Sequence, residues 1–179
     1  MIVDVADRGG GGLAPLLLDD ALRALHAPLS DRTVEILLCA AVGRGYGPGV
    51  DGRRLLREIV DVCVERVRRD DPSFVPALPG LSVYGALEGE VLARIEEAAP
   101  AVRVAVARVP YRSVPEVVPS LERLVSDVDP DLGYRLFLRV MRVYAVSITW
   151  SRFEGCLGLG GRFGCNAEVV DDGSLQITD

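Results

Sequence analysis

Residues 33–69 read TVEILLCAAVGRGYGPGVDGRRLLREIVDVCVERVRR, and this stretch sets the expectation for the whole fold. The part before the first glycine is short and almost entirely apolar, which is typical of a buried β-strand. A glycine-rich loop follows at 43–50, and Asp51 is placed to cap the next helix. From Gly52 to Arg69 apolar residues recur at helical spacing, with arginines and acids on the opposite face. The stretch therefore predicts a strand, a glycine loop and an amphipathic helix in succession.

The segments on either side of this unit predict an α+β fold. We expect a single domain over 14–179, preceded by a flexible N-terminal segment at 1–13. The sheet is expected to be mixed, to end in a C-terminal antiparallel meander and to carry helices mainly on one face. The other expected helices are 14–27, 88–98, 113–126 and 130–138, the last capped by Asp129, and the other expected strands are 81–86, 102–109, 139–152, 153–165, 166–170 and 174–178.

The composition excludes several classes of function. A net charge of −6 and an isoelectric point near 4.9 disfavour binding to nucleic acid or to a membrane surface. All 20 residues in the lysine-plus-arginine total are arginine, so the chain has no Schiff-base, P-loop or kinase-type lysine. His26 is the only histidine, and a histidine-rich metal site cannot be built from it. We therefore expect no cofactor and no metal.

The cysteines and the hydropathy of the chain indicate a reducing compartment. Cys39 and Cys63 lie among apolar residues and are expected to be small buried hydrophobes. No two cysteines have the C-x-x-C spacing of zinc ribbons or thioredoxin-like proteins. The first residues do not form a secretory signal, and no run approaches the roughly 18 apolar residues of a membrane span. We expect a cytoplasmic protein with reduced thiols.

The glycine loop before Asp51 is the first candidate site. A helix N-terminus offers unpaired N–H groups, and glycines let a ligand approach the backbone. Arg44, Gly45, Gly47 and Arg53 are therefore candidates to hold a carboxylate, a phosphate or the pyrophosphate of coenzyme A. The alternative interpretation is an ordinary glycine-built turn with solvated arginines.

Two family resemblances pass through this loop. The run Arg44-Gly45-Tyr46-Gly47-Pro48-Gly49 resembles the acetyl-coenzyme A loop of GNAT acetyltransferases, but only about one expected strand precedes it, where that family has three or four. The segment 46–58 is similar to the H-H-x-x-x-D-G region of condensation and chloramphenicol-acetyltransferase-like enzymes, with Tyr46 and Gly47 at the two histidine positions. Each resemblance covers less than a fifth of the chain. The first resemblance lacks the preceding strands, and the second lacks the base on which its family relies. We therefore adopt neither.

The second candidate site is the glycine-rich segment 150–165, WSRFEGCLGLGGRFGC. Its five glycines are costly in a strand, where they often mark a bulge or the close approach of a ligand. Arg152 and Arg162 flank Cys156 in the sequence, and nearby cations lower a thiol pKa, so Cys156 is a candidate nucleophile. Glu154 is a candidate acid or base. The alternative is a curved strand with an inert thiol.

Two functions remain open at this point. The first is a cofactor-independent enzyme of bacterial specialised metabolism that acts on a small acyl or polyketide-like molecule. Cys156, Glu154 or Tyr46 would then carry proton transfer or nucleophilic attack, and Arg44, Arg53, Arg152 or Arg162 would hold an anionic end. The second is a non-catalytic accessory subunit that binds another protein or a second copy of the chain as a homodimer. The expected partner is thus a small organic molecule or a protein, with no nucleic acid and no membrane.

Overall fold

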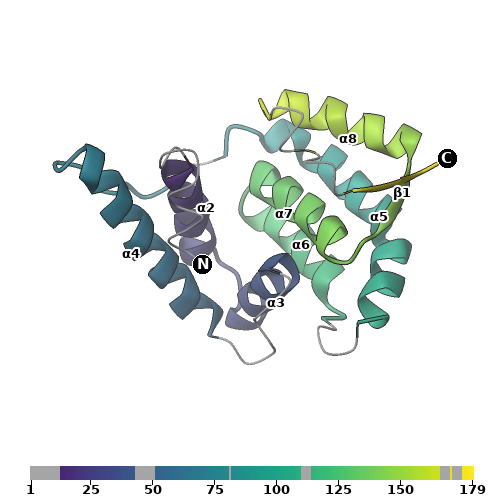
Figure 1. The fold of residues 1–179 in the computed structure, drawn as a ribbon, viewed down its shortest axis with the longest axis horizontal. Coiled ribbons are helices and arrows are strands. Elements are labelled where there is room, and N and C mark those ends of the chain that lie inside the picture. The colour runs from purple at the N-terminus through teal and green to yellow at the C-terminus, as the bar shows by residue number, and fades with distance from the viewer. Residues whose placement is uncertain (1–12, 43–50, 81, 110–113, 166–169, 171–174) are drawn as a thin grey trace.

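The structure is built mainly of α-helices (Figure 1). It is a computed structural model that describes residues 13–42, 51–80, 82–109, 114–165, 170 and 175–179. Its elements in chain order are α2 (Ala14–His26), α3 (Asp31–Val42), α4 (Gly52–Asp70), the 3₁₀ turn η2 (Gly85–Leu87), α5 (Glu88–Ala107), α6 (Val117–Asp127), α7 (Pro130–Val143), β1 (Ser147–Thr149), α8 (Trp150–Arg162) and β2 (Gln176–Thr178).

The predicted α+β fold is wrong, because most of the expected strands are helical. The segments 33–42 and 102–109 lie largely within α3 and α5, and most of 153–165 lies in α8. β1 and β2 pair in parallel, with Ile148 beside Ile177. The described residues therefore contain no C-terminal antiparallel meander, and the helices pack on one another instead of on one face of a sheet.

The remaining expected strands are turns, short extended pieces or segments outside the description. Within 139–152 the strand is confined to the three residues of β1, and within the described residues 175–178 it is confined to those of β2. From residue 82 onward, the expected strand at 81–86 is a turn that leads into η2. The expected strand at 166–170 and the flexible segment at 1–13 fall almost wholly outside the described residues.

α3 shows why an apolar run can be assigned to a strand although it forms a helix. A short run that is apolar throughout fits a buried helix as well as a buried strand, because burial on all sides removes the periodicity that separates the two. Val34, Ile36 and Leu37 are each no more than 5% exposed. The hydroxyl of Ser30 accepts a hydrogen bond from the backbone N–H of Thr33 at 3.1 Å, which satisfies one of the free donors at the start of the helix.

α5 continues through Pro100, where the sequence predicted that it would end. A proline inside a helix removes one backbone hydrogen bond and normally kinks or breaks the helix. Ile95 before the proline and Val102 and Val106 after it are each no more than 2% exposed, so both halves of the helix bury apolar surface in the core. Packing in the folded chain therefore overrides the local stop signal.

The helices with local start signals were predicted correctly. The carboxylate of Asp51 accepts a hydrogen bond from the backbone N–H of Arg54 at 2.9 Å and caps α4. Asp129 caps α7 by accepting from the backbone N–H groups of Asp131 and Leu132, at 2.8 and 3.0 Å. Such caps depend only on neighbouring residues, and the sequence therefore shows them directly.

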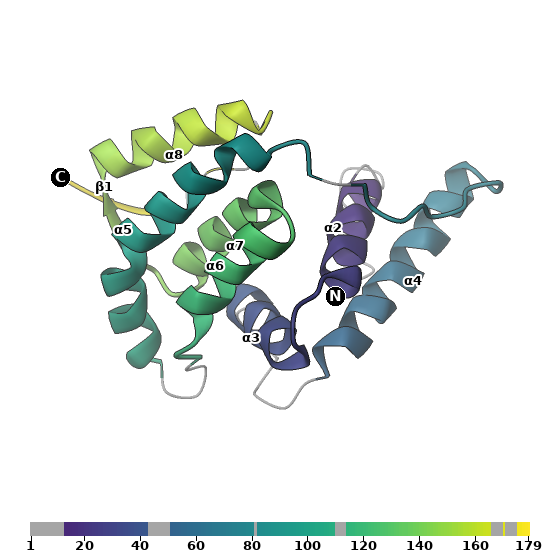
Figure 2. The same cartoon turned by 180° about the vertical axis from the view of Figure 1, so that it is seen from behind.

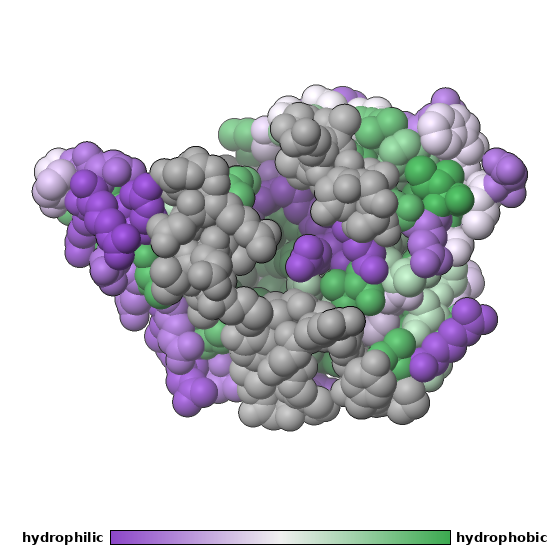
Figure 3. Space-filling model, in the orientation of Figure 1, coloured by the Kyte–Doolittle hydropathy of each residue, from purple (hydrophilic) through white to green (hydrophobic). Residues whose placement is uncertain are grey.

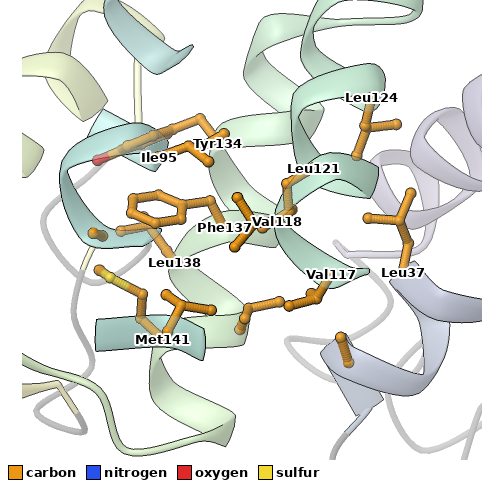
Figure 4. Packing of buried hydrophobic residues seen from close by; sticks show 14 of the residues in the cluster. Leu37, Ile95, Val117, Val118, Leu121, Leu124, Tyr134, Phe137, Leu138 and Met141 are labelled. Atoms are coloured by element: carbon orange, nitrogen blue, oxygen red, sulfur yellow. The ribbon is translucent and has the colours of Figure 1, made fainter. Parts of the chain in front are cut away.

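The main hydrophobic core lies where α3, α5, α6 and α7 meet (Figure 4). Leu121 of α6 points toward Phe137 of α7, and Ile95 approaches from α5. Leu37 reaches the same core from α3. Tyr134 is completely buried in it. This core positions α7, whose other side faces α2.

Two glycines of α8 let this helix lie close to its neighbours. A Cβ atom at Gly160 would overlap the side chain of Val170 and lie 3.5 Å from the hydroxyl of Tyr134. A Cβ atom at Gly155 would lie 2.8 Å from a guanidinium nitrogen of Arg94. At both positions it is the chain itself that occupies the space beside the glycine.

The helices form two parts, which we call the arm and the body (Figures 1 and 2). The arm consists of α2 and α4, which lie side by side, and the body consists of α3 and α5 to α8. The arm has a small hydrophobic cluster of its own, although Ala21 of α2 and Leu56 of α4 belong to the main core. This arm cluster consists of Ala14, Leu18, Leu22, Cys63 and Val64.

Candidate functional site

A pocket of about 190 Å³ lies where the arm meets the body. Figure 3 shows the surface hollowed between α2 and α7, with hydrophobic and hydrophilic residues side by side in the hollow. Among the described residues that line the pocket, only Asp20 and Arg135 are charged. The other lining residues are Leu17, Ala21 and Ala24 of α2, Leu38 of α3, Leu56 and Ile59 of α4, and Leu132 and Leu136 of α7.

The two charged groups of the pocket bind each other. Arg135 donates to both carboxylate oxygens of Asp20, with the second hydrogen bond at 2.8 Å. The same guanidinium donates to both oxygens of Asp131, one turn earlier on α7, at 3.2 and 3.0 Å. Arg135 thus joins the arm to the body, and the pair Asp20–Arg135 forms a polar edge on an otherwise apolar pocket.

Burial and charge act differently on the two partners. Burial raises the pKa of the Asp20 carboxyl, although the hydrogen bond and charge of Arg135 oppose the rise. Burial alone would lower the pKa of Arg135, but the hydrogen bond and charge of Asp20 and the charge of Asp131 raise it instead. For Arg135 the two carboxylates outweigh burial and favour the charged form. For Asp20 burial outweighs the single guanidinium, and the like charges of Asp131 and Asp19 add to the rise. Arg135 therefore stays charged.

A second ion pair joins the arm to the body next to the first. Arg23 of α2 donates to the buried carboxylate of Asp129 at 2.8 Å. It also donates to Asp19, one turn earlier on α2, at 2.7 Å. Asp129 is at the same time the cap of α7, so its carboxylate serves both the helix start and the contact with the arm.

The structure places the second predicted site in and around α8, away from this pocket. Cys156 is 3% exposed, and burial raises the pKa of its thiol. Arg94 lowers that pKa less than burial raises it, so the protonated, less reactive form is favoured. Glu154 of α8 is exposed on the surface. The gap that Cys156 borders has a volume of about 10 Å³, which is too small for a substrate.

Both predicted arginines of that segment are paired with glutamates of α5. Arg152 donates to Glu97 at 2.9 Å, and Arg162 donates to both carboxylate oxygens of Glu90. Exposed ion pairs of this kind contribute little to stability, but they connect α8 to α5. Arg152 borders the same gap of about 10 Å³ as Cys156, but its guanidinium is paired with Glu97 there.

Only one predicted residue of the glycine loop can be placed. Arg44, Gly45, Tyr46 and Gly47 lie outside the described residues, and their proposed roles stay predictions. Arg53 uses its guanidinium within the chain, since it donates to backbone carbonyls in the last turn of α2 and just after it, and to a carboxylate of α3. Its three acceptors are the carbonyl oxygens of Leu25 and Leu29 and the side chain of Asp31.

Sequence reasoning missed the pocket and both of its charged residues. A signal was present, because Asp20 follows Leu17 by three residues and precedes Ala24 by four, which places a carboxylate on an apolar helix face. On α7, Arg135 follows Leu132 by the same spacing. A charge within an apolar face indicates a partner on another helix, because an unpaired buried charge is costly. The sequence does not show which helix supplies that partner.

The two remaining cysteines and the single histidine discussed from the sequence lie in the core and at a helix end. Cys39 and Cys63 are buried, at 8% and 0% exposure, as expected for small hydrophobes. His26 is the last residue of α2. Within the described part of the chain, no group of three or more histidine, cysteine or acidic side chains could hold a metal ion. No helix there is both long enough and apolar enough to cross a membrane.

A larger hollow between α5 and α6 is a weaker candidate. Its volume is about 710 Å³, but it is open and its rim is mostly charged. The charged residues include Glu96 and Arg103 of α5 and Arg123 and Asp127 of α6. Residues of both signs in one shallow hollow do not select a ligand of either charge.

Comparison with known proteins adds no assignment. No protein family model matches the sequence, and neither a curated protein nor a solved structure matches it. The functional argument therefore depends on the geometry of the pocket.

Proposed function

We propose that this protein is a non-catalytic binding module, and that the pocket between the arm and the body takes up an apolar group of a small organic molecule. The observation that carries the proposal is the composition of the pocket wall, which is apolar except for Asp20 and Arg135. Apolar pockets with a few convergent polar groups are the usual form of small-molecule sites. The proposal combines the non-catalytic role of the second function that the sequence left open with the small organic ligand of the first.

The chemistry of the pocket supports binding over catalysis. Both oxygens of Asp20 accept hydrogen bonds from Arg135, which leaves this carboxylate poorly placed to take a proton from a ligand. The pocket wall contains no thiol, hydroxyl or imidazole among the described residues. Cys156, the candidate nucleophile from the sequence, is buried in another part of the body with a raised thiol pKa.

The volume of the pocket limits the size of the group that it can hold. A volume of about 190 Å³ is close to that of the roughly 150 Å³ apolar cavity that binds benzene in an engineered protein. It is below the range of about 300–1,000 Å³ that is usual for drug-sized ligands. The pocket therefore fits one ring or a short branched alkyl group, with the rest of a larger molecule outside.

Fluorobenzene is a suitable probe, because it has the expected size and its fluorine signal reports binding by NMR. We expect a dissociation constant on the order of 1 mM, equivalent to about −4 kcal/mol, which is realistic for a single ring. Replacing Ala24 with phenylalanine places a ring in the pocket, so Ala24→Phe should weaken binding by about tenfold or more, or about 1.4 kcal/mol.

The matched control is Ala93→Phe, which makes the same change at an exposed position of α5. This variant should bind fluorobenzene as the unchanged protein does. Absence of binding to the unchanged protein, or equal weakening by both variants, would contradict the proposal. A fluorescence melting curve for each variant shows whether it is folded at the temperature of the titration.

A further inference from the structure

We infer that the pocket selects an apolar molecule with a neutral hydrogen-bond acceptor, such as the carbonyl oxygen of a ketone, and that one N–H group of Arg135 holds this oxygen. The inference rests on the proposed function, because it names the class of ligand for the same pocket. It follows from two properties of Arg135, whose charge already faces two carboxylates while one of its hydrogen-bond donors is unused.

Arg135 has one N–H group for which no described residue serves as an acceptor. A guanidinium carries five N–H donors in a planar fork. Nε and Nη2 donate to the two oxygens of Asp131 at 3.2 and 3.0 Å, and Nη1 and Nη2 donate to the two oxygens of Asp20. These bonds use the single N–H of Nε, both of Nη2 and one of Nη1. The second N–H of Nη1 is therefore left over.

The unused N–H lies on the open edge of the guanidinium. Asp131 covers the edge formed by Nε and Nη2, and Asp20 covers the edge formed by Nη1 and Nη2. The remaining N–H of Nη1 is on the third edge, and Arg135 belongs to the pocket wall. Its side chain is 16% exposed, so water can reach this donor when the pocket is empty. A ligand oxygen that replaces such a water keeps the hydrogen bond.

The guanidinium at the pocket edge already faces two carboxylates, which disfavours an anionic ligand. Asp20 and Asp131 place two negative charges against its one positive charge. The neighbouring bridge has the same ratio, since Arg23 donates to both Asp19 and Asp129. A ligand carboxylate would add a further negative charge to this group and be repelled by the acids.

A cationic ligand is disfavoured for a different reason. The unused group at the pocket edge is a donor, and an ammonium group, which has donors and no acceptor, cannot bind to it. Each carboxylate oxygen of Asp20 and Asp131 already accepts a hydrogen bond from the guanidinium. The group that complements a free N–H without adding charge is a neutral oxygen, and the apolar wall takes up the rest of the molecule.

A matched pair of ligands isolates this hydrogen bond. Para-fluoroacetophenone and para-fluoroethylbenzene have nearly the same size and shape and differ by one carbonyl oxygen, and fluorine NMR reports the binding of both. In an apolar pocket without a donor the ketone binds more weakly, because it gives up its hydrogen bonds to water. With the free N–H of Arg135, we expect the ketone to bind about fivefold more tightly than the hydrocarbon.

Two charged ligands of similar size test the charge of the pocket edge. Para-fluorobenzoate and para-fluorobenzylamine should both bind more weakly than the ketone at neutral pH. In Asp131→Asn one carboxylate at Arg135 becomes neutral, so the affinity for para-fluorobenzoate should rise by about threefold or more. The matched control is Glu90→Gln, which removes one carboxylate charge from the ion pair with Arg162 and should leave every affinity unchanged.

The replacement Ala24→Phe, which places a ring in the pocket, shows where the ketone binds. This variant should weaken the binding of para-fluoroacetophenone as it weakens that of fluorobenzene. If the ketone bound equally well to it, the ketone would lie outside the pocket, and the inference would be wrong.

Three further results would overturn the inference. The first is a ketone that binds no more tightly than the hydrocarbon, and the second is a charged ligand that binds more tightly than the ketone. The third is an equal response of para-fluorobenzoate to Asp131→Asn and Glu90→Gln. If fluorobenzene binds but the ketone has no advantage, only this inference fails, whereas absence of binding by all of these ligands contradicts the proposed function as well. The comparison of ketone and hydrocarbon uses the unchanged protein, so it does not depend on the folding of a variant.

Discussion

Removing the hydroxyl of Tyr134 should change the stability of the protein in opposite directions at neutral and at alkaline pH. Tyr134 is completely buried and donates a hydrogen bond to the carbonyl oxygen of Cys156 at 2.6 Å. Its ring stacks on Phe163, with 5.3 Å between the centroids. Burial, with smaller contributions from the thiols of Cys156 and Cys165, raises the pKa of the phenol well above its ordinary value of 10.0. The folded protein therefore keeps this proton where the unfolded chain loses it.

The magnitude follows from the hydrogen bond and from the pKa. At pH 7, Tyr134→Phe should lower the free energy of unfolding by about 0.5–1.5 kcal/mol, the usual contribution of one hydrogen bond. A group whose pKa is raised by folding contributes stability that is present below the unfolded pKa and declines as the pH rises above it. Above pH 10 the unchanged protein should lose about 1.4 kcal/mol per pH unit through Tyr134, and the phenylalanine variant should not. The two stabilities should therefore cross between about pH 10 and pH 11.

Urea denaturation followed by circular dichroism at pH 7, 9, 10 and 11 measures this difference. The absence of lysine helps, because few groups other than tyrosines and thiols titrate in this range, and the thiols are common to both proteins. Absorbance at 295 nm should also show that Tyr134 does not ionise until the protein unfolds, as an ionisation step that the phenylalanine variant lacks. A difference in stability that stays constant from pH 7 to pH 11 would refute the reasoning.

Three further predictions test the core, the glycines and the thiols. Leu121→Ala should lower the free energy of unfolding by about 2–5 kcal/mol in urea denaturation, because Leu121 is completely buried. Gly160→Val should destabilise the protein, since a side chain there overlaps its neighbours, whereas Gly158→Ala, which faces open space on the same helix, should stabilise it by up to about 1 kcal/mol. With iodoacetamide, the half-buried Cys165 should be alkylated before Cys156, as peptide mass spectrometry would show, and faster labelling of Cys156 would favour the thiol role that the sequence indicated.

The elements that the sequence identified correctly are those whose signals are local. Asp51 and Asp129 each lie directly before a helix, and the structure confirms that both act as caps. The amphipathic spacing in 52–69 likewise matches α4, because a helix with one face in solvent keeps its periodicity. The burial of Cys39 and Cys63 followed from their apolar neighbours in the chain.

The assignment failed where the local preference of a segment differs from what its packing in the folded chain favours. In α8, four glycines within the helix weaken it by roughly 1 kcal/mol each relative to alanine, so local preference argued against a helix. In the structure Thr149 caps α8 by accepting a hydrogen bond from the backbone N–H of Arg152, and the sequence analysis did not identify this cap. The close packing of Gly160 against Val170 becomes available only when distant parts of the chain meet.

The sequence by itself determined the composition, the exclusion of lysine chemistry, the helix caps and the helices with one solvated face. Only the tertiary structure decided that the buried apolar segments are helices, and it alone brought Asp20 together with Arg135, 115 residues apart, at the edge of an apolar pocket. The physical reason is that local signals act over one or two turns, whereas a pocket and its charge pair exist only between helices that pack after the chain has folded.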